Sequence, residues 1–86
     1  MVVTLRGTVE VDPPGYFIQV PEHVVEELNA GKRPAVKATI NGVDYLSRIA
    51  VYSGRYYLGL RREFREAARL DVGDEVDITL EIDPSR

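Results

Sequence analysis

The chain has 86 residues, a formal net charge of −3 at pH 7 and no cysteine. A chain of this length forms one domain, and without cysteine it has no disulfide, no thiolate nucleophile and no cysteine-bound metal centre. Because phosphate contacts dominate the affinity of nucleic-acid binders, the negative charge disfavours a general nucleic-acid-binding protein.

The chain opens with two predicted strands. Apolar and polar residues alternate over residues 2 to 11 and again over 16 to 20, which is typical of strands with one buried face. The two prolines between them remove backbone donors, so residues 12 to 15 form a turn. The apolar start is interrupted at Arg6 and Gly7, and no later run could span a bilayer. We therefore expect a cytoplasmic protein with no membrane partner.

A short helix and an antiparallel hairpin follow. Pro21 is expected at the first helical position, and residues 29 to 31 are expected to end the helix, with Gly31 in the left-handed conformation that glycine readily adopts. An Asn-Gly dipeptide then joins a strand over residues 36 to 40 to another over 43 to 52, and this dipeptide strongly favours a tight hairpin turn.

The rest of the chain predicts a fifth strand, residues 55 to 60, a second helix, residues 61 to 69, and a sixth strand within residues 70 to 83. The sixth is the clearest, because its apolar residues alternate strictly with polar ones. The segment from Asp71 to Asp83 carries six acidic residues and no basic ones. We expect these acids to face the arginines between residues 55 and 69 and partly neutralise them.

A shift of 40 residues aligns the two halves of the chain without a gap. The apolar residues of the first strand fall on those of the fourth, namely Val3 on Val43, Leu5 on Tyr45, Val9 on Ile49 and Val11 on Val51. Any two alternating segments can be slid into phase, but the matching helices and loops favour a true duplication. Two repeats, residues 1–40 and 41–82, would then close one pseudo-two-fold barrel within the single domain 1–86. Because one chain holds both halves, we expect a monomer.

Four segments together resemble a known family. They are P-x-x-V from residue 21, GKRPxVKxTING over residues 31 to 42, SRIAV followed by GRY over 47 to 56, and RxAAxxxxGDEV ending at Val76. This combination is similar to the bacterial family called domain of unknown function nineteen-oh-five, found beside or fused to YdeI/OmpD-associated domains. The resemblance implies a mainly β fold, a six-stranded double-split β-barrel with two short helices, like the barrels of AbrB-type and MazE-type proteins. It implies no established activity, and Arg69 departs from the glycine expected after the paired alanines.

The outer face of the fourth and fifth strands is the first candidate site. A turn at Ser53 would pair Ala50 with Tyr57 and Arg48 with Gly59. The same face then carries four candidate residues, Arg48, Tyr52, Arg55 and Tyr57. Aromatic rings and arginines over a glycine can stack a planar or anionic ligand or a partner's side chain. Alternatively, Tyr57 only covers the strand beside Gly59, since single exposed aromatics are common.

The second helix is the other candidate site. Arg62, Arg65 and Arg69 recur three and four residues apart, and such a ridge could contact phosphates, as in an AbrB-like DNA-binding regulator. The alternative is that these arginines pair with Glu63, Glu66 and the acids that follow.

Residues suited to catalysis or metal binding are sparse. His23 is the single histidine and has no positioned partner, and the acidic sixth strand lacks the spaced loop of a calcium site. We therefore predict no catalytic residue, no metal and no cofactor. The leading hypothesis is a non-enzymatic binding or accessory module that contacts a small molecule or a protein, with DNA binding as the alternative.

Overall fold

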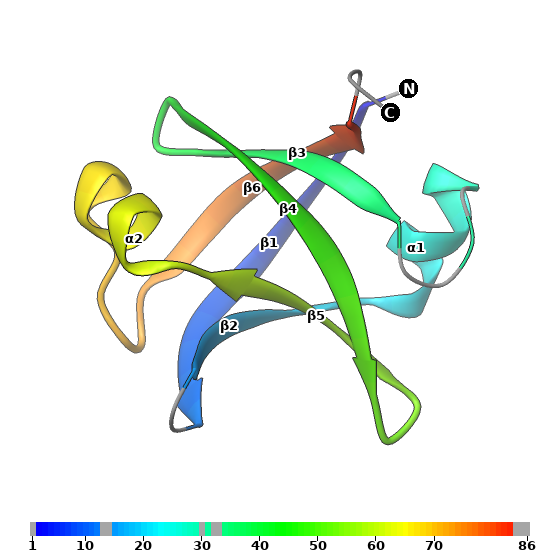
Figure 1. Ribbon diagram of the computed structural model, residues 1–86, viewed down its shortest axis with the longest axis horizontal. Helices are drawn as coiled ribbons and strands as arrows, with labels where there is room; N and C mark the ends of the chain where they lie inside the picture. Colours follow the sequence, from blue (N-terminus) through cyan, green and yellow to red (C-terminus); the bar gives the residue numbers. More distant parts are fainter. Residues whose placement is uncertain (1, 13–14, 30, 32–33, 84–86) are drawn as a thin grey trace.

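Six antiparallel strands close into a barrel in the computed structural model, which describes residues 2–12, 15–29, 31 and 34–83 (Figure 1). The strands are β1 (Val2–Asp12), β2 (Gly15–Val20), β3 (Ala35–Ile40), β4 (Val43–Tyr52), β5 (Arg55–Leu60) and β6 (Glu75–Ile82). Helix α1 (Glu22–Leu28) follows β2, and helix α2 (Arg62–Ala68) follows β5. Around the barrel the order is β1-β2-β5-β4-β3-β6, and β6 pairs with β1 to close it. The predicted fold class is confirmed.

The strand order and the pairing register are both unchanged when β1, β2 and β3 are exchanged with β4, β5 and β6. The pair Gly7–Val76 becomes Ser47–Val36, which occurs in the β3–β4 ladder. Two further pairs join equivalent residues directly, Ile18 with Leu58 and Thr39 with Thr79. A two-fold exchange of this kind is what the 40-residue alignment predicts, although duplication as its origin stays a hypothesis.

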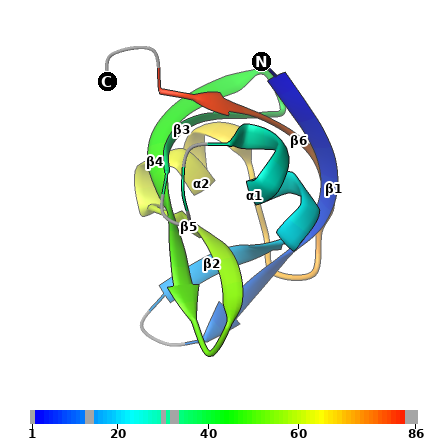
Figure 2. The same cartoon turned by 90° about the vertical axis from the view of Figure 1, so that its right-hand side faces the viewer.

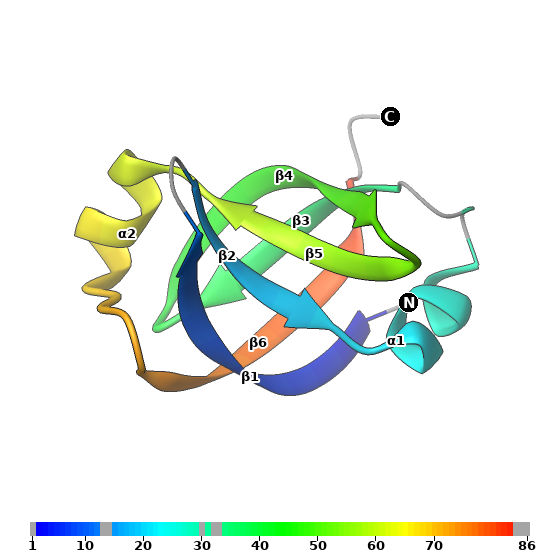
Figure 3. The same ribbon diagram turned by 90° about the horizontal axis from the view of Figure 1, so that it is seen from below.

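The helices lie at opposite ends of the barrel. In Figure 2 the view falls onto α1 and the strands surround both helices, while Figure 3 shows α1 and α2 at the two ends of the sheet. Helix α1 packs on β1 and β5, and α2 packs on β4. Within the described ranges, neither helix has the length and apolar character needed to cross a membrane.

The core is formed by the inward residues of both halves together. Ile18 and Leu58 are completely buried, as are the inward residues at the centres of β3 and β6, Val36, Ala38, Ile40, Ile78 and Leu80. Val11 is the exception to the predicted alternation, because it is 42% exposed. It pairs with Tyr16 near the tip of the β1–β2 hairpin, beyond the reach of the core, so its inward assignment was wrong.

The two ends of α1 differ in detail from the prediction, whereas α2 ends without a glycine, as expected. Pro21 precedes α1 in an extended conformation as its N-cap, and the left-handed C-cap of α1 is Asn29, two residues before Gly31. At the end of α2, Arg69 adopts the same left-handed conformation, with φ 56° and ψ 53°. The Asn41 side-chain amide donates a hydrogen bond of 2.7 Å to the Ala68 carbonyl. A side chain from the β3–β4 turn therefore helps to close a helix that lacks the usual glycine.

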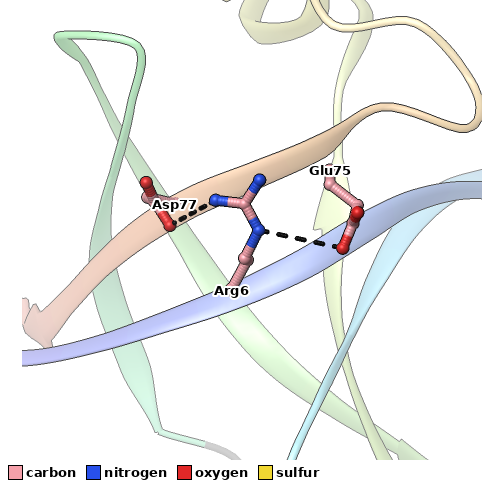
Figure 4. A network of polar contacts seen from close by, with 3 residues as sticks. All are labelled: Arg6, Glu75 and Asp77. Atoms are coloured by element: carbon pink, nitrogen blue, oxygen red, sulfur yellow. Dashed lines mark hydrogen bonds and ion pairs between the residues drawn. The ribbon is translucent and has the colours of Figure 1, made fainter.

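The acidic residues of β6 pair with the neighbouring strands and not with α2. Arg6 on β1 lies between Glu75 and Asp77, at 3.7 and 3.0 Å (Figure 4). Lys37 on β3 lies 2.8 Å from Glu81. The prediction that these acids neutralise the arginines of residues 55 to 69 is wrong, because β6 has β1 and β3 as its neighbours in the barrel.

Replacing Arg69 by glycine is expected to stabilise the protein. A residue with a side chain pays a steric penalty in the left-handed conformation that glycine avoids, so Arg69→Gly should raise the free energy of unfolding by about 0.5–1 kcal/mol. Urea unfolding measures the change. Arg69→Ala is the matched control, because it removes the guanidinium and keeps the penalty; an equal gain in that variant would contradict the explanation.

Replacing Gly7 by alanine is expected to destabilise the protein. A Cβ at Gly7 would overlap with Cγ2 of the completely buried Ile18 and lie 3.3 Å from Cδ1 of Ile78. Overpacking of this kind costs about 1–3 kcal/mol. Gly59→Ala is the control, since a Cβ there has no neighbour within 4 Å. Equal unfolding midpoints for the two variants would refute the steric argument.

Candidate functional site

An open cavity of about 490 Å³, more exposed than enclosed, lies at the α2 end of the barrel. Its wall is formed by β2, β4, β5 and the first turn of α2, and the side chains that carry chemistry there are Tyr16, Tyr45, Ser47, Arg61, Glu63 and Arg65. Pockets that hold small molecules commonly measure roughly 300–1,000 Å³. The cavity is therefore of a size that suits a small ligand.

The cavity lies where β4 and β5 stop pairing. Their ladder runs from Tyr52–Arg55 to Ile49–Leu58, and within these fully described strands it goes no further. From Val43 to Arg48, β4 pairs with β3 instead. β5 continues along β2 as far as Leu60. The two strands therefore leave a gap between them, and two residues in the first half of β4, Tyr45 and Ser47, line the cavity.

Arg65 is held against one wall of the cavity by an aromatic ring. Its guanidinium carbon lies 3.6 Å from the centre of the Tyr16 ring, a cation–π contact that fixes the plane of the guanidinium. The Arg65 Nε is buried and has no hydrogen-bond partner among the described residues. Buried donors are nearly always paired in folded proteins, so an unpaired donor at this position is unusual and marks Arg65 as a residue that packing alone does not explain.

Tyr45 supplies a hydroxyl group on the facing wall. Its ring stacks on Phe64 of α2, with centroids 4.5 Å apart and an angle of 11° between the planes. Burial raises the pKa of the Tyr45 hydroxyl; the nearby Arg61 opposes this change, and Glu63 adds to it. The hydroxyl therefore stays protonated at neutral pH and can donate a hydrogen bond.

The cavity is positively charged although the whole chain is negative. Three arginines and one glutamate line it. Arg62 is bound to Glu66 at 2.8 Å, which leaves Arg61 and Arg65 facing a single acid, Glu63. The local excess of positive charge favours an anionic ligand.

The α1 end of the barrel carries apolar residues at the positions equivalent to three polar residues of the cavity. Under the two-fold exchange, Tyr45, Ser47 and Arg65 correspond to Leu5, Gly7 and Val25. Leu5 and Val25 are buried apolar residues that belong to the core at the α1 end. The barrel is therefore filled with apolar side chains at one end and lined with polar ones at the other, an asymmetry that the fold itself does not require.

The predicted outer patch, formed by Arg48, Tyr52, Arg55 and Tyr57, is present only in part. The pairs Tyr52–Arg55 and Ala50–Tyr57 are confirmed, but Arg48 pairs with Ala35 on β3 and not with Gly59, because β4 has left β5 by that point.

The aromatic residues of the patch pack on one another. The Tyr57 ring meets Phe17 edge-on at 5.0 Å and lies 6.2 Å from Tyr52, which is 68% exposed. Phe17 was missed by the sequence analysis, although its place opposite Gly59 follows from the strand order. Arg48, Tyr52, Arg55 and Tyr57 do not line the cavity.

The arginines of α2 do not form one common ridge. Arg62 pairs with Glu66, as the alternative interpretation predicted, and Arg65 lies on Tyr16. Arg69 forms the left-handed helix end. The sequence pattern pointed to Arg65 as a surface residue; only its contact with Tyr16 of β2 shows that it belongs to the cavity.

His23 is exposed on α1, at the end of the barrel away from the cavity (Figure 3). Over the described ranges, no group of three or more His, Asp and Glu residues is arranged to hold a metal ion.

The fold and the cavity define a small closed-barrel domain with a positively charged, ligand-sized opening beside one helix. Residues 5–80 match the family described as Domain of unknown function (DUF1905), so the chain belongs to that family, and the family predicted from the sequence is confirmed. None of the curated proteins matches the chain.

The burial of Tyr45 predicts a loss of stability at alkaline pH. Its hydroxyl has a raised pKa in the folded state and the ordinary value of 10.0 in the unfolded chain, so the unfolded state ionises first as the pH rises. Its contribution to stability is complete below pH 10 and is lost above it. Tyr45→Phe should therefore lose less thermal stability than the wild type between pH 8 and pH 11. The pKa of Lys37, raised by Glu81, affects both proteins equally.

Proposed function

We propose that this chain is a non-enzymatic binding module that holds a small molecule in the cavity beside α2. The observation that carries the proposal is the difference between the two ends of the barrel. Apolar residues fill the α1 end, whereas Tyr45, Ser47 and Arg65 take the equivalent positions at the α2 end. The contact with Tyr16 stabilises Arg65, but its unpaired buried Nε costs free energy that an apolar residue would not lose, so a role in binding accounts for this position better than stability does.

The outer patch is the competing surface. A protein partner could contact it through Tyr52 and the neighbouring arginines, as the sequence predicted. Its rings, however, contact one another, which accounts for them without a partner. We therefore place the ligand in the cavity, and binding at Arg48, Tyr52, Arg55 and Tyr57 stays a prediction.

DNA binding is the weaker alternative. It needs arginines that reach phosphates side by side along an exposed ridge, but Arg62 is paired with Glu66 and Arg65 lies on Tyr16 beside the cavity. The likeness to AbrB-type barrels is a likeness of fold, and fold alone gives little support for function. The bacterial context, the cytoplasmic location and the monomeric state likewise remain expectations from the sequence.

A fragment screen by NMR tests the proposal. Neutral, cationic and anionic fragments are added to the ¹⁵N-labelled chain, and we expect the fragments that bind to shift the amides of Gly15, Ser47 and Gly59. Ser47→Phe should fill the cavity and weaken these fragments at least about tenfold, while Tyr52→Ala, in the outer patch, should leave them unchanged. Thermal unfolding checks that both variants fold. The proposal fails if no fragment shifts the cavity amides, or if Tyr52→Ala abolishes binding and Ser47→Phe does not.

A further inference from the structure

We infer that the cavity beside α2 selects an aromatic carboxylate, with the carboxylate bound by Arg65 and Arg61 and the ring lying against the glycine-lined wall. This inference rests on the proposed function and narrows it to one class of ligand. Three features of the cavity carry it: the orientation of Arg65, the balance of charge, and the shape of the wall.

Arg65 presents its edge, and not its face, to a ligand. One face of the guanidinium is covered by the Tyr16 ring at 3.6 Å, so its N–H groups can be reached only in their own plane. The Nε is buried, so the donors left for a ligand are the N–H groups of the two terminal Nη nitrogens. A carboxylate is planar and accepts two parallel hydrogen bonds from such an edge, which is the pairing for which arginine is best suited.

The charge balance favours an anion. Arg61 and Arg65 attract it more strongly than Glu63, which lines the same cavity, repels it. Attraction and repulsion both scale with the ligand's charge, so the preference for a carboxylate over phosphate rests on the planar pairing with Arg65 and on the contact of the ring with the wall. The hydroxyl groups of Tyr45 and Ser47 add neutral donors, which can bind a carboxylate oxygen without further charge.

The wall of the cavity has room for a flat ring. Gly15 and Gly59 line it and contribute backbone atoms only. The backbone is therefore exposed there as a surface without side chains, and Leu60 and Tyr45 supply apolar area beside it. Aromatic rings pack well on such surfaces, and cavities of this kind usually combine apolar walls with a few polar anchors.

Titration of the ¹⁵N-labelled chain with benzoate tests the inference. We expect benzoate to shift the amides of Gly15, Ser47 and Gly59 and the Nε–H signal of Arg65. Benzamide has the same shape without the charge and should bind at least about tenfold more weakly, because a hydrogen bond between charged groups is lost. Inorganic phosphate at pH 7.5 should also bind more weakly than benzoate.

Two variants of Arg65 test whether this residue binds the carboxylate of benzoate. Arg65→Gln should weaken the binding of benzoate at least about tenfold. Arg65→Lys keeps the charge but loses the paired N–H donors of the guanidinium, so it should also weaken the binding of benzoate. Arg6→Gln is the matched control, because it removes one arginine from β1, outside the cavity, and should leave the benzoate affinity within about twofold. If the Arg65 variants do not fold, Arg61→Gln tests the same pocket.

The outcomes separate this inference from the proposed function. Equal binding of benzoate and benzamide, or tighter binding of phosphate, would overturn the aromatic carboxylate and leave a small-molecule site in place. Unchanged benzoate affinity in Arg65→Gln would overturn the role of Arg65. If neither benzoate nor any fragment shifts the cavity amides, both proposals are wrong.

Discussion

The structure depends on the contact between the two halves of the chain across β2 and β5. Ile18 and Leu58 are paired there, both completely buried, and each is the equivalent of the other under the two-fold exchange. Neither half has a closed apolar core of its own, because β2 pairs with β5 and β3 pairs with β6. Burial of apolar surface is the main favourable term in folding, so the halves become stable only together. Gly7 shows how close this packing is, since Ile18 occupies the space that a side chain would need.

Much of the fold was readable from the sequence because the signals were local. Alternating residues and the Asn-Gly turn predicted β4 and β5 with the bounds that the structure has. The 40-residue shift also placed the helices in equivalent positions. The helix ends were harder to predict, because Asn29 and Arg69 adopt left-handed conformations that sequence preference assigns to glycine. In α2 the compensation comes from Asn41, 27 residues away in the chain. A contact of that kind has no local signature.

The candidate site was less predictable than the fold, for a physical reason. The outer patch was deduced from hairpin register, which holds for Tyr57 and fails for Arg48 once β4 turns from β5 to β3. That departure leaves a gap, which depends on the path of both strands through the barrel; at the equivalent gap between β1 and β2 the apolar residues Leu5 and Val25 are buried, and only the polar side chains at the α2 end leave a cavity. Arg65 looked like a surface residue because helical spacing grouped it with Arg62. A comparison of equivalent positions in the two halves of the chain would have been the better guide. Val25 and Arg65 are equivalent, and they differ in polarity far more than two core residues should.

Helix α2, which forms one side of the cavity, has only seven residues. Helices this short are not stable in isolation, so α2 exists because Phe64 stacks on Tyr45, Arg65 lies on Tyr16 and Asn41 caps its end. Two of these three contacts are made by residues that also line the opening. The binding surface and the helix that borders it are thus stabilised by the same side chains, and neither can be altered without disturbing the other.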